Sequence, residues 1–404
     1  MRLFILAALA FPAGAAAGTR APYVPHDPGV VLQKVPSVKD PRVRRFQALR
    51  AKLSNRPHDR ALALKLSRAY LGYGRGTGDA RYLGRALAVI APWMRHKPPP
   101  VPVLLVHATI LQSRHHFRAS RRELKRVLQR APGNAQAWLT QATVAMVQGD
   151  YRLANHSCVH LARVGGNFMG TMCTAELRSL SGHDRQALTL LRLIEHPGTE
   201  APASIKGYVE GLIADTAKRL GRDKLADRHF RKALQFTPGD NFLLADFGDL
   251  LLRQGRPKAA LQLVKGYGQS DTSFMRRVFA EAALDSPRAH DDIAVMAARF
   301  KAMEQRGSHV YRREQARFVL YLEHDPQRAL RLARRNWTVQ RAPKDVRVYL
   351  EAALAAHKPA AARPVLRFLK RTGMSTRVVD PLAARVRSAL AAAPGTAAAA
   401  ENAP

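Results

Sequence analysis

The sequence predicts an all-α fold, an α-α superhelix of about eight helical hairpins with a terminal capping helix. An alanine recurs every 33 to 39 residues, and a glycine stands five positions before each alanine. The alanines are Ala154, Ala187, Ala226 and Ala260, and the glycines are Gly149, Gly182, Gly221 and Gly255. A repeat of this length indicates a solenoid, in which each helical pair packs on its neighbours.

Apolar spacing and prolines divide the chain into segments. Val43, Phe46 and Leu49 recur at helical spacing, and three glycines at positions 74, 76 and 78 predict a long turn in the first repeat. In chain order we expect a signal peptide (1–17), an extended proline-rich arm (18–40), an amino-terminal capping helix (41–56), a repeat array (57–274), a degenerate repeat (275–309), further repeats (310–377), a carboxy-terminal capping helix (378–393) and a disordered tail (394–404).

The first residues have the pattern of an export signal. Residues 1–17 combine one positive charge, Arg2, with a short apolar run that ends in three alanines. This order predicts a cleaved secretory signal peptide, with an uncleaved anchor as the alternative. Because no later segment approaches 18 uncharged apolar residues, we expect an exported, periplasmic protein whose mature chain has no transmembrane segment.

The chain carries a large positive charge. Its 66 lysines and arginines outnumber 30 acidic residues, which gives a formal net charge of +36. Such a balance attracts polyanions whatever the fold. For an exported chain the candidate polyanionic partners are acidic polysaccharide, lipopolysaccharide and anionic membrane surfaces, and we expect no specific binding of nucleic acid. The alternative is that the basic surface is hydrated and binds no partner.

The most specific repeat runs from Trp138 to Leu161. A large residue, small residues, a turn glycine, an aromatic residue and an alanine follow in order: Trp138, Ala142, Ala145, Gly149, Tyr151 and Ala154. This pattern resembles tetratricopeptide-repeat proteins, over roughly residues 57–377. The resemblance implies a concave groove lined by the first helix of each pair, partner binding, and no enzymatic activity.

The resemblance also implies which residues line the groove. One set is mostly neutral and apolar: Leu105, Thr109, Gln112, Leu139, Thr143, Met146, Met172 and Glu176. A second set is charged and aromatic: Tyr208, Asp215, Lys218, Phe242, Asp249 and Arg253. A protein or peptide segment with apolar anchors fits such a groove, whereas the alternative for Met146 and Met172 is packing between repeats. Basic runs fall on second helices, so a polyanion would meet the convex face.

The two cysteines are placed to pair. Cys158 lies on a second helix and Cys173 on the next first helix, nearly equidistant from a turn at Gly165 and Gly166. Antiparallel helices bring such positions to the same height. Because disulfides form in exported proteins, we predict a disulfide between these two cysteines. Two free thiols are the alternative.

The sequence lacks the patterns of known catalytic and metal sites. His156 and His160 are four residues apart, which suits a metal ion, but no third ligand is evident and we predict no metal site. Haem, metalloprotease, phosphate-loop and serine-hydrolase motifs are absent, so we predict no catalytic residue and no cofactor. The prediction is a non-enzymatic exported scaffold that holds a partner in its groove and assists envelope assembly, secretion or localisation. The alternative is a basic polyanion-binding envelope protein.

Overall fold

The computed structural model describes residues 40–195, 201–308 and 310–392, and these residues form helices and short connections with no strand. The all-α prediction is confirmed. The predicted signal peptide, residues 18–39 of the arm and the predicted tail lie outside the described ranges. Among the described helices, none has both the length and the apolar character needed to cross a membrane.

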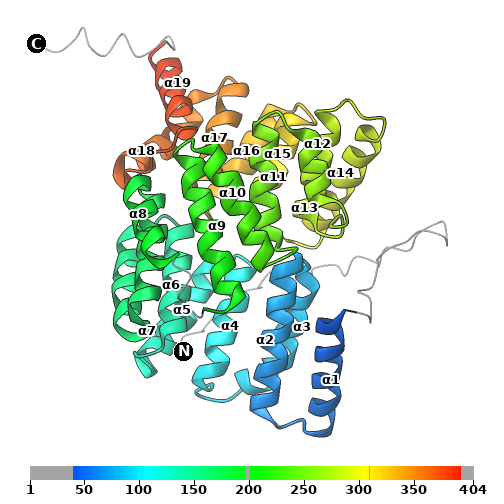
Figure 1. The fold of residues 1–404 in the computed structure, drawn as a ribbon, viewed down its shortest axis with the longest axis vertical. Helices are drawn as coiled ribbons and strands as arrows, with labels where there is room; N and C mark the ends of the chain where they lie inside the picture. Colours follow the sequence, from blue (N-terminus) through cyan, green and yellow to red (C-terminus); the bar gives the residue numbers. More distant parts are fainter. Residues whose placement is uncertain (1–39, 196–200, 309, 393–404) are drawn as a thin grey trace, which may run out of the picture. The chain divides into compact units, whose positions relative to one another are not determined.

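The helices pack as consecutive pairs (Figure 1). The first are α1 (Pro41–Asn55), α2 (Arg60–Thr77), α3 (Ala80–Met94), α4 (Val101–Ser113), α5 (Phe117–Arg130), α6 (Ala135–Val147) and α7 (Tyr151–Leu180). The next are α8 (Asp184–Ile194), α9 (Ala203–Arg219), α10 (Asp223–Phe236), α11 (Asn241–Arg253), α12 (Pro257–Val264), α13 (Asp271–Ala282) and α14 (Ala289–Gln305). The last are α15 (Arg312–Tyr321), α16 (Pro326–Trp337), α17 (Pro343–Ala355), the 3-10 helix η1 (Pro359–Ala362), α18 (Arg363–Thr372) and α19 (Val379–Ala391).

The hairpin of α6 and α7 shows how the sequence produces a repeat. Gly149 has a φ of +70°, a left-handed conformation that glycine adopts without steric cost. Its backbone N–H donates to the Met146 carbonyl over 3.0 Å, which ends α6. Asp150 then begins α7, because its carboxylate accepts a hydrogen bond from the Leu153 N–H over 3.2 Å. Turn and cap together reverse the chain within a few residues.

The long element α7 consists of two helices joined at Gly166, which has a φ of 83° and a ψ of 166°. The second half turns back along the first, so the turn lies where the sequence predicts it. A Cβ added at Gly170 would lie 2.7 Å from the Cα of Ala162, so this position requires glycine. The sulfur atoms of Cys158 and Cys173 lie 2.03 Å apart, at bonding distance.

One turn prediction is wrong. Gly74 and Gly76 do not form a long loop, because α2 continues to Thr77 and only Gly78 takes a left-handed conformation, with a φ of 72°. The structural reason lies at Gly74. A Cβ there would lie 3.1 Å from the Cβ of Tyr82, so the glycine lets α3 pack closely on the last turn of α2. Gly74 thus serves helix packing, and Gly78 ends α2.

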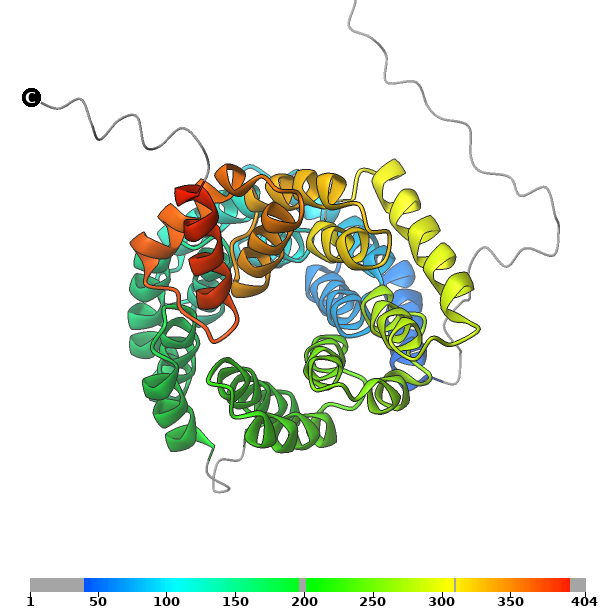
Figure 2. The ribbon, with the colours of Figure 1, turned by 90° about the horizontal axis from the view of Figure 1, so that it is seen from above.

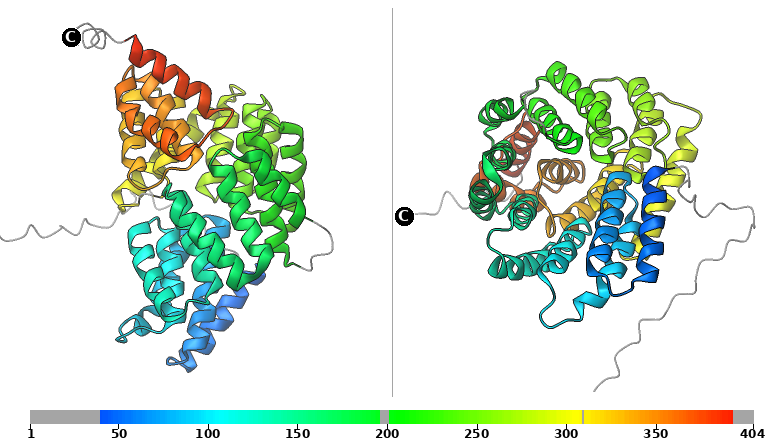
Figure 3. Two further views of the ribbon diagram at one scale, coloured as in Figure 1. Left: turned by 90° about the vertical axis from the view of Figure 1, so that its left-hand side faces the viewer. Right: turned by 60° about the horizontal axis from the view of Figure 1, so that its bottom comes forward.

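The helices wind so that distant repeats meet. Figure 2, which looks along the winding, shows α17 and α18 in orange beside the teal and green α6 to α8, and Figure 3 shows the same neighbours from two other directions. The Arg341 N–H donates to the Val147 carbonyl over 2.7 Å, and the rings of Tyr151 and Phe368 are 6.3 Å apart. At a second meeting point the Tyr311 hydroxyl donates to the Gly78 carbonyl over 3.3 Å. The array is therefore cross-braced, unlike an open solenoid in which only neighbours touch.

We predict that Gly170→Ala destabilises the protein, by about 1–3 kcal/mol, because the new methyl group overpacks the contact between the halves of α7. Gly72→Ala is the matched control, since Gly72 lies inside α2 with open space around its Cβ position. There alanine gains up to about 1 kcal/mol of helix propensity. Urea unfolding, followed by circular dichroism, measures the change in stability for both substitutions. Equal effects of the two substitutions would contradict the close packing at Gly170.

We predict that the protein contains the Cys158–Cys173 disulfide, which closes a loop of 15 residues. In the chain-entropy model such a bridge contributes about 3 kcal/mol, so reduction should lower the unfolding midpoint of the protein. Peptide mapping of the protein isolated without reductant should find the linked pair. A peptide map with both thiols free would contradict the predicted disulfide. An unfolding midpoint that reductant leaves unchanged would contradict it as well.

Candidate functional site on the inner face

The amino-terminal groove positions lie largely inside the protein, which corrects the expected exposure of three of them. Leu105 is buried between helices, and Met146 and Met172 are each only 2 % exposed. The reason is that neighbouring helices cover these side chains: α4 packs on α2 and α6, and α7 packs on α8 and α9. For both methionines the burial agrees with the alternative, packing between repeats.

The two groove threonines are turned toward their own helices. The Thr109 hydroxyl donates to the Leu105 carbonyl over 2.9 Å, and the Thr143 hydroxyl donates to the Leu139 carbonyl over 3.0 Å. Leu139 itself is half-buried in the cluster around Trp138. This half of the predicted groove therefore offers few free polar groups.

The carboxy-terminal groove positions present two exposed aromatic rings. Tyr208 on α9 is 42 % exposed and Phe242 at the start of α11 is 60 % exposed. The Tyr208 hydroxyl donates to Oε2 of Glu176 over 2.9 Å. Burial of the phenol group and the Glu176 charge raise the pKa of Tyr208, and Arg75 of α2 opposes this rise. Helices far apart in sequence therefore surround this tyrosine.

Further along α9 and α11, the first helices of several repeats converge on a pocket of about 220 Å³. Its walls come from α9, α11, α15 and α17, with the end of α7 and the segment before α19. Four of the predicted groove residues line it: Asp215, Lys218, Asp249 and Arg253. Other charged lining residues are Arg219, Arg313, Glu314, Arg317, Lys344, Arg347 and Glu351, and the apolar ones include Leu180, Val348, Val378 and Val379.

A buried ion network supports the pocket from behind. Arg276 on α13 is only 1 % exposed, and its guanidinium lies 2.7 Å from Oδ2 of Asp249 and 3.2 Å from Oε2 of Glu314. Arg317 reaches Oδ1 of the same aspartate over 2.6 Å, and Arg313 reaches Oε1 of the same glutamate over 2.8 Å. Each carboxylate therefore joins two arginines, and the network ties α11, α13 and α15 together.

This network displaces the pKa values of its carboxylates. Burial alone would raise the pKa of Glu314, but the charges of Arg276 and Arg313 outweigh it and lower this pKa to about 2. Asp249 behaves in the same way: burial would raise its pKa, but the charges of Arg276 and Arg317 outweigh burial and lower it. Both carboxylates are ionised at neutral pH, as the arginine contacts require.

Lys344 is the unusual cation of the pocket. About a third of its side chain, 35 %, remains exposed, yet protein surrounds it and its ammonium pairs with Asp246. Burial and the nearby charge of Lys218 lower the pKa of Lys344 to about 7. This lysine therefore changes charge within the physiological pH range.

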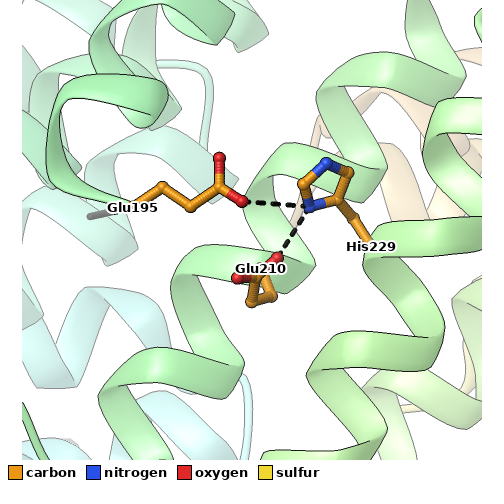
Figure 4. Close-up of side chains that lie close together, drawn as sticks. All are labelled: Glu195, Glu210 and His229. Carbon is orange, nitrogen blue, oxygen red and sulfur yellow. Dashed lines mark hydrogen bonds and ion pairs between the residues drawn. The ribbon is translucent and has the colours of Figure 1, made fainter. Parts of the chain in front are cut away.

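Three side chains near α10 have the geometry of a metal site, as Figure 4 shows. Nδ1 of His229 lies 2.7 Å from Oε2 of Glu210 and 3.7 Å from Oε1 of Glu195. However, the Lys232 ammonium contacts both carboxylates, at 2.5 Å and 3.1 Å. A lysine in this position already supplies the positive charge, so the cluster is a complete ion-pair network without a metal ion.

The histidine pair whose spacing suits a metal ion, His156 and His160, lies against Trp138. The rings of His160 and Trp138 stack with centroids 4.4 Å apart, and His156 contacts the same tryptophan edge-on at 5.7 Å. Both histidines therefore cover an aromatic side chain at the surface. This arrangement is compatible with the prediction that they hold no metal ion.

Sequence reasoning missed the pocket residues on α15 and α17. A signal was present, because Lys344, Arg347 and Glu351 recur at helical spacing along one face of α17. The same register that marks Asp215 and Asp249 extends to this helix. What the sequence did not indicate is the winding that brings α17 opposite α9 and α11.

We predict that Glu314→Gln lowers the free energy of unfolding at pH 7 by about 3–5 kcal/mol, because it leaves Arg276 buried without one of its partners. The pKa of Glu314 is lowered from 4.5 to about 2, so its contribution exists above pH 4.5 and is lost as the pH falls toward 2. The difference in unfolding free energy between the variant and the unsubstituted protein should therefore become smaller in acid.

Urea titrations at pH 7, 4 and 3 measure this gap. The control is Glu323→Gln, which removes an ion pair with Arg328 at the surface and should cost less than about 1 kcal/mol. A gap for Glu314→Gln that stays constant with pH would show that the carboxylate is not held ionised by the arginines.

No protein-family model and no curated protein matches this chain. Solved structures give weak matches. A tetratricopeptide repeat protein from Parabacteroides merdae is 15 % identical, with a TM-score of 0.38 over 58 % of this chain and 91 % of that one. A Rap protein solved with competence and sporulation factor is 12 % identical, with a TM-score of 0.49 over 81 % and 96 %.

PilW, described as a widely conserved type IV pilus biogenesis factor, is 13 % identical, with a TM-score of 0.41 over 50 % of this chain and 94 % of that one. Matches at this level assign no function. The described helices have the paired architecture of tetratricopeptide repeats, and any functional argument rests on the chain's own geometry.

Proposed function

We propose that this chain is a non-enzymatic scaffold of the cell envelope whose inner face binds a segment of a protein partner. The observation that carries the proposal is the pair of exposed aromatic rings, Tyr208 and Phe242, on α9 and α11, two helices that also contribute charged residues to the pocket. Large aromatic side chains exposed on a rigid framework are typical anchors of protein interfaces.

The framework around these rings favours binding without rearrangement. The Tyr208 hydroxyl donates to Glu176. Phe242 is the second residue of α11, and its N–H donates to the carboxylate of the helix cap, Asp240, over 2.9 Å. Pre-ordered anchors lose little conformational entropy when a partner binds. The occupant we expect is an extended or helical segment with apolar side chains that contact the two rings.

The envelope location rests on the export signal expected over residues 1–17. An exported scaffold of this kind would assist assembly, secretion or localisation of its partner. No role in catalysis is proposed.

A second candidate function, binding of a polyanion, is favoured by arginines that lie within electrostatic range of each other, namely Arg341 with Arg371 and Arg312 with Arg335. Burial and the charge of Arg371 lower the pKa of Arg341, and burial and the charge of Arg335 lower the pKa of Arg312. Such repulsion is relieved when an anionic surface binds. In this proposal the convex face contacts acidic polysaccharide, lipopolysaccharide or an anionic membrane.

We predict that a photocrosslinking amino acid at Phe242 captures an envelope protein that the same group at Leu193 does not. Leu193 on α8 is the control, since it is 67 % exposed but lies on a second helix. With the captured protein purified, Phe242→Glu should weaken binding at least tenfold, a loss of about 1.4 kcal/mol, and Leu193→Glu should leave it unchanged.

The salt dependence separates the two functions. Groove binding through aromatic anchors should persist between low and physiological ionic strength, whereas charge-driven binding should weaken steeply. Equal capture at both positions, or binding that disappears with added salt and ignores Phe242→Glu, would refute the proposed groove function.

A further inference from the structure

We propose that the pocket between α9, α11, α15 and α17 is a binding site for a small organic anion, a carboxylate with a short apolar body. This inference is independent of the protein partner proposed above, because the pocket has its own walls and its own chemistry. A single water needs about 10–15 Å³ of such a cavity, so a volume of about 220 Å³ admits a small organic molecule.

The pocket is closed at one side by the connection that precedes α19. Thr376, Val378 and Val379 line it. Two contacts hold this connection in place. Gly373 lies against Gly182, which follows α7, and the side chain of Arg377 packs over Gly221, which follows α9. A Cβ added at Gly221 would lie 2.8 Å from the Cδ of Arg377. A long peptide therefore has less room here than on the open face around Phe242. The enclosure favours a small ligand.

Cations outnumber carboxylates around the pocket. Seven basic but only four acidic side chains line it. The lining carboxylates pair with several of these cations, as Asp215 does with Lys218, and further counter-charges come from residues outside the lining. Lys344 pairs with Asp246, Arg219 with Asp184 over 3.1 Å, and Arg253 with Asp223 over 2.6 Å, and none of these three carboxylates is among the lining residues. The protein is thus compensated without a ligand, yet it presents positive groups to the cavity.

The position of Lys344 makes it the contact for the anion. It stands in the first turn of α17, where the partial positive charge of the helix end also favours an anion. The charged groups that face it are Asp215, Lys218 and Arg219 from α9, Asp246 and Asp249 from α11, and Asp345 from its own helix, while Arg313, Glu314 and Arg317 of α15 line the same pocket.

The apolar part of the wall determines what the anion carries. Leu180, Val348 and Val379 contribute branched aliphatic side chains to the same cavity as the lysine. Ligand sites commonly combine an apolar lining with a few polar groups that orient the ligand. An inorganic ion would leave this apolar surface in contact with water, so a carboxylate on an aliphatic or aromatic body fits better.

Calorimetric titration with benzoate, with benzamide as the uncharged analogue and inorganic phosphate as the anion without an apolar body, tests the site. Benzoate should bind, and the two analogues should bind at least tenfold more weakly, a difference of about 1.4 kcal/mol. Lys344→Met should abolish the preference for benzoate over benzamide. Lys344→Arg should retain it, and Lys258→Met on α12, an exposed lysine outside the pocket, should leave it unchanged.

The pH dependence has a definite sign. Lys344 is charged below pH 7 and neutral above it, whereas a carboxylate stays ionised between pH 6 and 8. Benzoate affinity should therefore fall by up to about tenfold per unit as the pH rises above 7, and the fall should disappear in Lys344→Arg. As a second readout, benzoate should protect Lys344 from an amine-specific label at pH 7.5, measured by peptide mapping.

Several results would overturn the proposal. They are an absence of benzoate binding at millimolar concentration, equal binding of benzoate and benzamide, or an affinity that Lys344→Met leaves within twofold. Melting curves of each variant show whether it is folded. Should Lys344→Met not fold, labelling of the unsubstituted protein still decides, because lack of protection of Lys344 counts against the site.

Discussion

The burial of Arg276 is the constraint on which the carboxy-terminal half of the structure depends. A guanidinium that is 1 % exposed cannot be left unpaired, so Asp249 of α11 and Glu314 of α15 must both reach it. This requirement sets the angle between three consecutive first helices. Because each carboxylate also joins a second arginine at the pocket wall, the same contacts that hold the repeats together place charge on the inner face.

The winding of the helices brings together charged residues that are far apart in the sequence. Lys218 and Lys344 are 126 residues apart and yet line one pocket, because the chain curves until α17 stands opposite α9. The approach of two cations in a confined space, together with burial, brings the pKa of Lys344 down to about 7. A straight array with the same repeats would leave this lysine in water with its ordinary pKa.

Much of the local structure could be predicted from residue patterns, and the site only in part. Gly149 and Asp150 identify a turn and a cap through backbone geometry, which is a short-range matter. Of the groove residues, Asp215 and Asp249 lie at the pocket, whereas Met146 and Met172 are buried, since register places a residue on a face but does not say how closely the next helix covers that face.

The sequence by itself determined the helical pairs, their order and most of their turns, because small residues, glycines and caps act over a few positions along the chain. Only the tertiary structure decided the curvature, the cross-braces at Gly78 and Val147, and the convergence of α9, α11, α15 and α17 on one pocket. The physical reason is that small tilts between neighbours add up over many repeats. The sum depends on side-chain packing at every interface, which no single repeat encodes.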